Sequence, residues 1–394
     1  MQQNRPRLIL VRCLRAIAGT LLVWATLAAR TEAASSCVNP GGTGGCFASV
    51  QAAIDAAATG DLVTVAAGTY AEQITIGPPK RLTLVGAGAG ATILQSAGGV
   101  PAVRVGPSTR TTLSGITLQD GGLAVDEAAS VTLTGCAIDA GGGNAASAAA
   151  RSRLSLEDCT ISGASGPAIY SEGSQLDVVR SDIHDNTGTG IQTRKLRMTD
   201  SSVRDNGLYG IEMHGGRIRG STVSGNLVYG VQVGSVAPFG GGTLRVERST
   251  IHGNSFGGIS VAERYAAIVD QSTVADNGEF GVAASAGFFR APGRLTLRSS
   301  IVSGHATVDC TGLARTRGAN VVEDPSGCTI AGPAPIVGDP LLGPLADNGG
   351  PTRTRAPGPG SPALGAVLDA SCRNPDQRGV ARSVPCDAGA FEVP

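Results

Sequence analysis

The sequence is poor in aromatic residues. Phe, Trp and Tyr make up only 3% of its 394 residues, whereas glycine accounts for 58 of them. A compact globular core usually contains more aromatic mass, while a stack of thin layers that turn at small residues needs less. The composition therefore favours a layered, repetitive architecture.

Long apolar segments are also scarce. The one apolar run near the N-terminus, Ala16–Ala29, is too short to span a bilayer comfortably. Arginines precede it and small residues follow it, with cleavage expected after Ala33 or Ala34. We therefore predict that residues 1–34 are a signal peptide and that the mature protein is secreted or displayed at the cell surface, with no transmembrane segment.

The mature chain has no excess of positive charge. Removal of residues 1–34 takes away five arginines and Glu32, which leaves 26 basic and 30 acidic residues and a net charge of −4. Nucleic-acid binding needs a basic face, so we expect no nucleic-acid partner. The sequence does not indicate the oligomeric state.

Nine cysteines are present, and eight remain once Cys13 leaves with the signal peptide. No histidine lies at metal-ligand spacing from them, so zinc is not expected. An even number suits an oxidising compartment. They fall in close sequential pairs, and we predict the disulfides Cys37–Cys46, Cys136–Cys159, Cys310–Cys328 and Cys372–Cys386. For Cys136 and Cys159, two reduced thiols remain an open alternative.

The sequence repeats itself at intervals of 20 to 28 residues. In each repeat an Ile or Val is followed three residues later by Asn, and four residues after the Asn by Gly and another Ile or Val. Short alternating runs such as Leu154-Ser155-Leu156 lie between these motifs and are typical of strands with one buried face. Several short strands per repeat, without a helical period, predict a parallel β-helix of about nine or ten coils.

Equivalent residues of a β-helix stack in rows, about 4.8 Å apart. One row should be an asparagine ladder at a turn, in which side-chain amides bond neighbouring coils. The glycines after it should mark the next bend with positive φ. Cys136 and Cys159 occupy the position that serine holds in later coils. The asparagines are Asn186, Asn206, Asn226, Asn254 and Asn277, the glycines Gly190, Gly210, Gly230, Gly258 and Gly281, and the serines Ser181, Ser201, Ser221, Ser249 and Ser272.

The ends of a solenoid need caps that cover apolar rungs and unpaired edges. A helix over Phe47–Ala58 is predicted at the front, where Val50, Ile54 and Ala57 share one face. We divide the chain into the signal peptide (1–34), an N-terminal cap with the first strands (35–80), the coils (81–309) and a C-terminal cap (310–394). The last is rich in Pro and Gly, contains four cysteines and is expected to be loop-rich and disulfide-stapled.

Two stretches resemble known families. The stretch "FASVQAAIDAAATGDLVTVAAGTYAEQITI" resembles the opening of the right-handed parallel β-helix proteins of the pectate lyase-like superfamily. The stretches "GDPLLGPLADNGGPTRTRAPGPGSPALGA" and "DQRGVARSVPCDAGAFE" resemble the C-terminal segment of bacterial proteins described as choice-of-anchor Q. The resemblance implies an all-β, right-handed, single-stranded parallel β-helix in an exported or surface-displayed protein. No apolar sorting tail precedes Pro394, which leaves anchoring open, and no catalytic motif of pectate lyases or polygalacturonases is matched.

Strand alternation identifies outward-facing residues with possible chemistry. Gln192, Glu212 and Gln232 should form one outward row, and Arg194 and His214 a neighbouring one, with Lys195 close in sequence. A uronan lyase needs a base for the proton α to a carboxylate and a cation for the developing charge. The candidate catalytic residues are therefore Arg194, Lys195, Glu212 and His214, although outward solenoid residues are also polar simply for solubility.

Two further features are candidates for ligand contact. Tyr209, Tyr229 and Phe280 each precede the bend glycine and could form an outward strip that stacks on sugar rings, with Gln192 and Gln232 as polar partners; the alternative is that the rings cover the corner backbone. Asp185 and Asp205 stack beside the asparagine ladder and could share Ca²⁺, but two carboxylates fall short of a full ligand set. No cofactor is expected, and Ca²⁺ only for a lyase.

The sequence thus predicts an exported bacterial β-helix protein that acts by surface contact, through polysaccharide or cell-surface glycan binding or a structural role. One alternative is a polysaccharide lyase or related uronan-modifying enzyme, so enzyme activity is left open, and another is an adhesin-like stalk without glycan affinity. A deep basic groove at Arg194, Glu212 and His214 would favour the enzyme. A flat face of mixed charge would favour binding or structure.

Overall fold

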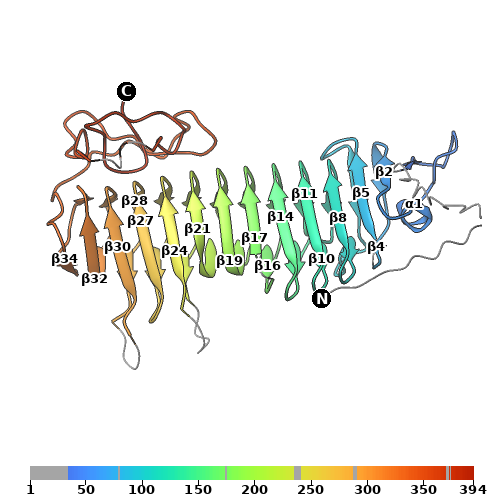
Figure 1. Ribbon diagram of the computed structural model, residues 1–394, viewed down its shortest axis with the longest axis horizontal. Coiled ribbons are helices and arrows are strands. Elements are labelled where there is room, and N and C mark those ends of the chain that lie inside the picture. The colour runs from blue at the N-terminus through green and yellow to red at the C-terminus, as the bar shows by residue number, and fades with distance from the viewer. Residues whose placement is uncertain are drawn as a thin grey trace, which may run out of the picture. The chain divides into compact units, whose positions relative to one another are not determined.

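The protein forms a stack of parallel β-coils (Figure 1). The computed structural model describes residues 34–394 except 79, 174, 235–240, 287–290, 370–371 and 373. The predicted signal peptide, apart from residue 34, lies outside the described residues. No helix in the described part of the chain is long and apolar enough to cross a membrane.

In the described part of the chain, the strands form a 22-stranded and a 12-stranded sheet, and the strand pairs in both sheets are parallel. The larger sheet contains β1 (Ser35–Val38), β2 (Leu62–Val65), β4 (Ile74–Ile76), β5 (Arg81–Gly86), β7 (Val103–Val105), β8 (Arg110–Ser114), β10 (Leu123–Val125), β11 (Ser130–Thr134), β13 (Ala146–Ala148), β14 (Arg153–Glu157), β16 (Ile169–Ser171), β17 (Gln175–Val179), β19 (Ile191–Thr199), β21 (Ile211–Arg219), β23 (Tyr229–Val233), β24 (Thr243–Glu247), β26 (Gly257–Val261), β27 (Ala266–Asp270), β29 (Phe280–Ala284), β30 (Arg294–Arg298), β32 (Val308–Arg317) and β34 (Cys328–Ala331). The smaller sheet contains β3 (Gly68–Tyr70), β6 (Thr92–Gln95), β9 (Thr117–Gln119), β12 (Ala137–Asp139), β15 (Thr160–Ser162), β18 (Asp182–His184), β20 (Ser202–Arg204), β22 (Thr222–Ser224), β25 (Thr250–His252), β28 (Thr273–Ala275), β31 (Ile301–Ser303) and β33 (Val321–Val322).

Each coil therefore presents three faces. The first face, which we call ladder 1, runs through β4, β7, β10, β13, β16, β19, β21, β23, β26, β29 and β32. Ladder 2 runs through β5, β8, β11, β14, β17 and onward to β34, and the smaller sheet is ladder 3. β19, β21 and β32 are long enough to belong to both ladders 1 and 2.

The number of coils is larger than the sequence suggested. Ladder 3 has twelve strands in the described part of the chain, one for each turn, so the prediction of nine or ten coils was too low. The parallel ladders extend from Ser35 to Ala331, beyond the predicted coil range of 81–309 on both sides. The outer coils lack the Asn and Gly-Ile motif and were therefore not counted.

The interior is filled by columns of aliphatic side chains that point inward from the three faces. In β14, for example, Leu154 and Leu156 are fully buried while the residues beside them face outward. Because every coil repeats this alternation, apolar residues of successive coils stack into one continuous core. The low aromatic content fits this interior, since Leu, Ile, Val and Ala fill it almost alone.

The asparagine ladder forms as predicted. The Nδ2 atom of Asn226 donates to Oδ1 of Asn254 at 2.9 Å, and Asn206 makes the same bond to Asn226. The ladder ends at His305, whose Nε2 lies 3.2 Å from Nδ2 of Asn277. Buried amides at the turn are thus paired between coils instead of being left unsatisfied.

The glycines that follow the ladder have another role than predicted. Gly210 and its equivalents do not have positive φ; the left-handed corner residues are instead those just before the asparagines, such as Asp185, Asp205 and Gly225. A Cβ on Gly210 would lie 2.7 Å from Nδ2 of Asn226 and 2.7 Å from the carbonyl oxygen of Gly230. Glycine is therefore required there because the neighbouring coil approaches closely, not because of its backbone angles.

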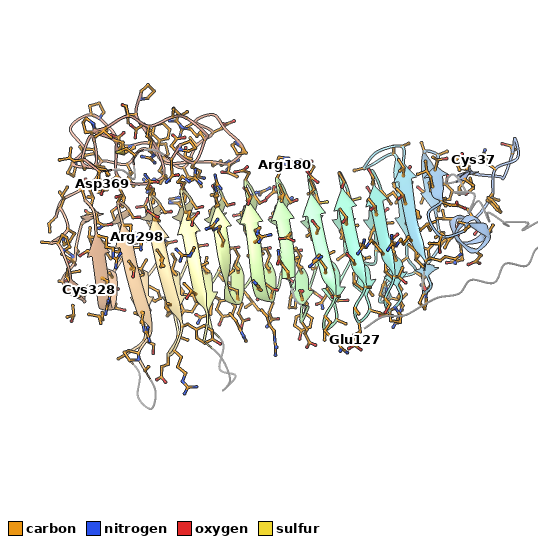
Figure 2. All side chains as sticks on the ribbon, in the orientation of Figure 1. Cys37, Glu127, Arg180, Arg298, Cys328 and Asp369 are labelled. Atoms are coloured by element: carbon orange, nitrogen blue, oxygen red, sulfur yellow. A yellow bond between two sulfur atoms is a disulfide. The ribbon has the colours of Figure 1, made fainter. Side chains whose placement is uncertain are left out.

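A second corner carries the serine row. Ser201 accepts a bond from the backbone N–H of Ser181 at 3.1 Å, and its own hydroxyl donates to the carbonyl of Thr199. Arg180 lies beside this row, at the ends of the strands (Figure 2). Its Nε is 2.8 Å from Oδ1 of Asp158 in the preceding coil. These contacts join neighbouring coils at the corner.

Three of the four predicted disulfides are present: Cys37–Cys46, Cys310–Cys328 and Cys372–Cys386. The prediction for Cys136 and Cys159 is corrected, because both are buried free thiols. Each sulfur lies near the carbonyl two residues earlier, at 3.5 Å and 3.2 Å. The thiols thus take the place and the bonding of the serine hydroxyls in later coils.

The N-terminal helix is shorter than predicted. α1 spans Val50–Ala56, within the predicted range, and begins after Ser49, whose hydroxyl accepts from the N–H of Ala52. Its residues Val50, Ala53 and Ile54 are buried in the same core as the coils. The apolar face of the helix therefore packs on the first strands.

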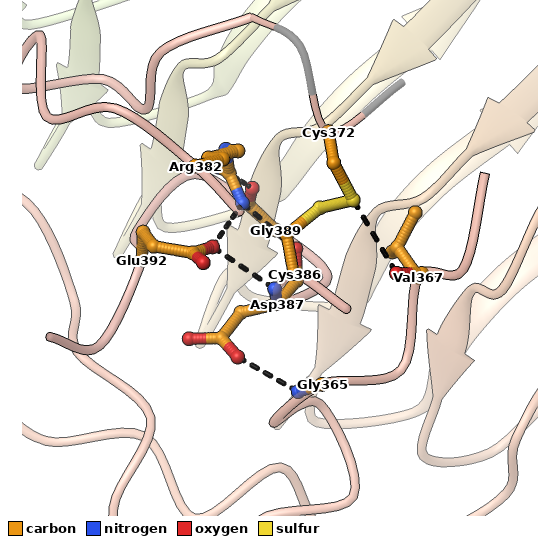
Figure 3. Close-up of a disulfide and its surroundings, with 8 residues drawn as sticks. All are labelled: Gly365, Val367, Cys372, Arg382, Cys386, Asp387, Gly389 and Glu392. Atoms are coloured by element: carbon orange, nitrogen blue, oxygen red, sulfur yellow. Dashed lines mark hydrogen bonds and ion pairs between the residues drawn. A yellow bond between two sulfur atoms is a disulfide. The ribbon is translucent and has the colours of Figure 1, made fainter. Parts of the chain in front are cut away.

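Residues 336–394, which we call the C-terminal segment, begin at the last coil, where Ile336 bridges Val321 of β33. They lie along ladder 3, where Thr222 donates to the carbonyl of Arg353 and Ala390 N–H donates to Thr273. The segment contains almost no regular structure and is held internally by Cys372–Cys386 and by the buried Arg382–Glu392 ion pair at 3.0 Å (Figure 3). The outward-facing Thr222, Thr250 and Thr273 of ladder 3 are buried, so the segment covers a face that water would otherwise contact.

Candidate functional site

The candidate site lies where two consecutive coils are shortest. The asparagines around β19 and β21 are 20 residues apart, whereas the next interval is 28 residues. In these short coils the strand continues straight from ladder 1 into ladder 2, without the corner that separates β16 from β17. The two straight strands form the floor of a hollow.

The hollow has a volume of about 340 Å³. β19 and β21 contribute its floor, and residues of the preceding coils, such as Ala150 and Glu172, lie at its edge. Its lining contains Tyr170, Gln192, Arg194, Glu212 and His214. Three of the four predicted catalytic residues are therefore together.

Lys195 is the exception among the predicted catalytic residues. It is exposed on β19 and does not line the hollow. Gln232 is also outside it, because its side chain donates to the carbonyl of Gly234 at 2.9 Å. Both predictions placed these residues by proximity in sequence or register, which does not fix the direction of a long side chain.

Hydrogen bonds orient the polar groups of the hollow. Gln192 donates to Glu212 at 3.0 Å, and the hydroxyl of Tyr170 donates to Glu172 at 2.6 Å. Arg194 makes no ion pair with a described carboxylate, although it is exposed at the hollow. An arginine without an internal partner is available to an anionic ligand.

Burial and neighbouring charge set the protonation of these groups. Burial raises the pKa of Glu212, although the bond from Gln192 opposes this. Burial and the nearby Arg194 lower the pKa of His214, which keeps its imidazole neutral near neutral pH. The bond to Glu172 and burial raise the pKa of Tyr170, so its phenol stays protonated. The hollow thus has mixed charge and combines a neutral imidazole with a phenol donor.

Tyr170 and Glu172 were not among the predicted site residues. In the register of ladder 1, Tyr170 pairs with Gln192, which in turn pairs with Glu212. It is thus the previous member of the outward row that the sequence did identify. Extending that row by one coil would have found Tyr170.

The predicted aromatic residues form a continuous strip near the hollow. The rings of Tyr209 and Tyr229 are stacked with centroids 5.7 Å apart, and Phe280 lies 5.6 Å from Tyr229. Phe256 adds an edge contact to Tyr229 at 5.2 Å and is itself exposed. Leu208 and Leu227 are exposed on the same turns, which extends the apolar surface of the strip.

Asp185 and Asp205 are bound to neighbouring side chains. Asp185 lies 2.7 Å from Nδ1 of His184, and Asp205 accepts from Arg204 at 3.0 Å. Both have positive φ at the corner, a conformation that Asp tolerates well. Within the described ranges, no group of three or more His, Cys, Asp or Glu residues could hold a metal ion. The two aspartates therefore have a corner role in the structure, and Ca²⁺ binding by them stays a prediction.

Comparison with known protein families identifies the family to which this fold belongs. The model of the family described as "Right handed beta helix region" matches residues 98–237 and 192–332, together more than half of the chain. The chain belongs to the right-handed β-helix family. The match covers β19 and β21 twice, where the 20-residue repeat is most regular.

Solved structures show the same fold. The A-module of mannuronan C-5 epimerase AlgE4 from Azotobacter vinelandii matches with a TM-score of 0.53 and 18% identity, over 72% of this chain and 90% of that one. Pectate lyase Pel9A matches with a TM-score of 0.49 and 14% identity, over 92% of this chain and 98% of that one. No curated protein sequence matches the chain. At these identities the likeness concerns the fold alone.

Proposed function

We propose that the protein binds an acidic polysaccharide along ladder 1. In this proposal Arg194 pairs with a sugar carboxylate in the hollow and the aromatic strip supports neighbouring sugar rings. The observation that carries it is Arg194 itself, which has no ion-pair partner among the described residues and lines a hollow with hydrogen-bonding side chains. Arginine binds carboxylates through two parallel N–H bonds.

The aromatic strip supports the same proposal. Tyr209, Tyr229 and Phe280 present flat apolar rings with polar edges, which suits stacking on the apolar faces of sugars. Tyr209 lies three residues before Glu212, on the turn that leads into β21, and Tyr229 and Phe280 continue the strip at β23 and β29. A solved protein of the same fold, AlgE4, is named for its action on mannuronan, a polymer of acidic sugars.

A second candidate is β-elimination by a polysaccharide lyase, favoured by the protonation states in the hollow. The neutral His214 would accept the proton α to the sugar carboxylate while Arg194 holds that carboxylate. The bond from the sugar ring to the leaving glycosidic oxygen would break, and the phenol of Tyr170 would protonate that oxygen. The products would be an unsaturated sugar and a free hydroxyl.

One experiment separates these possibilities. Purified mature protein is titrated calorimetrically with polyuronates and a neutral glucan, while near-ultraviolet absorbance is followed for the unsaturated sugar. We expect binding to polyuronates that falls at least about tenfold in Arg194→Gln and is unchanged in Arg197→Gln, an exposed arginine of the same strand outside the hollow. A rise in absorbance would show β-elimination and would favour the lyase over binding without turnover. If the folded protein had no affinity for any glycan, both hypotheses would be wrong and a structural stalk would be the remaining interpretation.

We also propose that the protein is exported and that its C-terminal segment is of the choice-of-anchor Q type. The three disulfides support an oxidising compartment. The experiment is expression with residues 1–34 present, followed by cell fractionation and N-terminal sequencing. Retention in the cytoplasm with Met1 intact would contradict export.

A further inference from the structure

A second pocket lies away from the hollow, between the coils and the C-terminal segment. It has a volume of about 400 Å³. The coils contribute the end of β21 and the corner before β25, and the segment contributes residues 375–379 and Pro351. Its charged lining residues are Asp200, Arg219, Arg248, Asp376 and Arg378.

Arg248 is the central cation of this pocket. The residue is only 7% exposed, and the one hydrogen bond from its guanidinium to a described acceptor goes to the carbonyl oxygen of Pro375, at 3.3 Å. No described carboxylate lies within ion-pair distance of it, Glu247 and Asp270 included; Glu247 pairs instead with Arg217 at 3.2 Å. A buried guanidinium with so few acceptors is costly unless another anion satisfies it.

Arg219 adds a second cation at the rim. It is exposed at the end of β21 and makes no ion pair within the described part of the chain. Burial lowers the pKa of Arg248, and the nearby charge of Arg219 lowers it further. An anion bound between these two arginines would reduce the electrostatic repulsion between them.

The remaining charges do not neutralise these two arginines. Asp376 and Arg378 satisfy each other, with Nε and Oδ2 2.8 Å apart, and Asp376 also accepts backbone N–H groups of Arg378 and Val380. Asp200 is the one carboxylate left, and it is not within ion-pair distance of either Arg219 or Arg248. The pocket therefore has a net positive charge and unused guanidinium donors.

We propose that this pocket binds an oxyanion, either a carboxylate or sulfate group of a glycan or a free sulfate or phosphate ion, which joins Arg248 and Arg219 of the coils to the C-terminal segment. The planar guanidinium suits a tetrahedral or carboxylate oxyanion through paired N–H bonds. Because Arg248 belongs to the coils and its one acceptor, Pro375, to the segment, an anion here would strengthen the contact between the two parts. This site is independent of the hollow on ladder 1.

The test is calorimetric titration of the mature protein with sulfate, phosphate and glucuronate, at ionic strength held constant with chloride. We expect binding that is lost in Arg248→Gln and weakened about tenfold or more in Arg219→Gln. Arg245→Gln removes an exposed arginine of β24, the strand before Arg248, and should bind as the parent does. Absence of heat with all three anions, or equal affinity in Arg248→Gln, would overturn the proposal.

A second readout guards against a variant that simply folds poorly. Hydrogen exchange of residues 351–394 should slow when sulfate binds the parent protein, and this protection should be missing in Arg219→Gln, whose altered residue is exposed. Equal protection in that variant would mean a general salt effect and would also overturn the site. The titration is then repeated with dextran sulfate and polygalacturonate to identify where the bound oxyanion comes from. Tighter binding of these polymers than of the small ions would identify the ligand as a glycan. Binding of the small ions alone would identify it as a free ion.

Discussion

The rings of Tyr229 and Phe280 are in contact, with centroids 5.6 Å apart, although they belong to coils that are not adjacent. Gly257 of the intervening coil pairs with both residues in the ladder and has no side chain to separate them. A Cβ at Gly257 would lie 2.7 Å from carbons of the Phe280 ring. The direct contact between these two rings therefore depends on one glycine, while Phe256 makes a second connection through edge contacts to both.

The first prediction concerns this glycine. Gly257→Ala should push Phe280 away from Tyr229 and break the direct contact between their rings. We expect polyuronate affinity to fall about threefold to tenfold, as expected for the loss of one aromatic contact, with little change in thermal stability. Val100→Ala, which trims an exposed apolar side chain between β6 and β7 and outside the strip, is the matched control. Unchanged affinity in Gly257→Ala would show that this ring contact does not contribute to polyuronate binding.

The second prediction concerns the asparagine ladder. Asn226→Ala removes the amide that donates to Asn254 and accepts from Asn206. Buried partners would lose their bonds, at a cost of about 1–3 kcal/mol for each unsatisfied group. Denaturant unfolding should show a loss of this size, whereas Arg245→Ala at an exposed position should show almost none. A loss below about 0.5 kcal/mol would mean that water replaces the amide.

The third prediction concerns Glu212 and the pH dependence of stability. Its folded-state pKa is raised by burial, so the folded state holds the proton more tightly than the unfolded state. Stability from this residue is present at low pH and is lost as the pH rises through the folded pKa. Glu212→Gln should thus be more stable than the parent at a pH of about 7, with the difference vanishing toward a pH of about 4.

The control for this pH series is Glu279→Gln, which removes an exposed carboxylate on a neighbouring turn. Unfolding free energies of the three proteins are measured at each pH. If Glu279→Gln differed from the parent in unfolding free energy with the same pH dependence, the effect would come from the overall charge of the protein and not from the burial of Glu212.

The fourth prediction concerns His214 and ligand affinity. Because burial and Arg194 lower the pKa of His214, it is neutral near pH 7 and becomes a cation only in mild acid. Sugar carboxylates stay ionised down to a pH of about 4. Polyuronate affinity should therefore rise as the pH falls from about 7 to about 5, and His214→Gln should flatten that dependence. If polyuronate affinity still rose at lower pH in His214→Gln, the protonation of another group would be responsible.

The fifth prediction concerns Cys136 and Cys159. Both are buried free thiols, and the bond from Cys159 lowers the pKa of Cys136 to about 7 while raising that of Cys159. Burial should nevertheless protect both from alkylation in the folded protein. Mass spectrometry after iodoacetamide treatment should find them modified only when denaturant is present, and a linkage between them in the untreated protein would contradict the structure.

Local sequence patterns were enough to predict the fold class. The Asn and Gly-Ile spacing, the short alternating runs and the serine row predict stacked coils, because each coil forms the same contacts with the next. The same stacking places His305 at the end of the asparagine row, where it contacts Asn277. The repeat pattern did not give the correct reason for Gly210 and its equivalents. A close approach between coils and a positive φ both require glycine, so the sequence alone cannot tell them apart.

Other features depended on the tertiary structure. The sequence placed Glu212, His214 and Arg194 on one face, because strand register follows from the repeat. It did not show the hollow, which exists because 20-residue coils omit a corner that the preceding coils have. Nor did it show that the C-terminal segment lies along ladder 3, with Arg248 buried against Pro375. That contact joins residues 127 positions apart, and no local pattern in the chain records it.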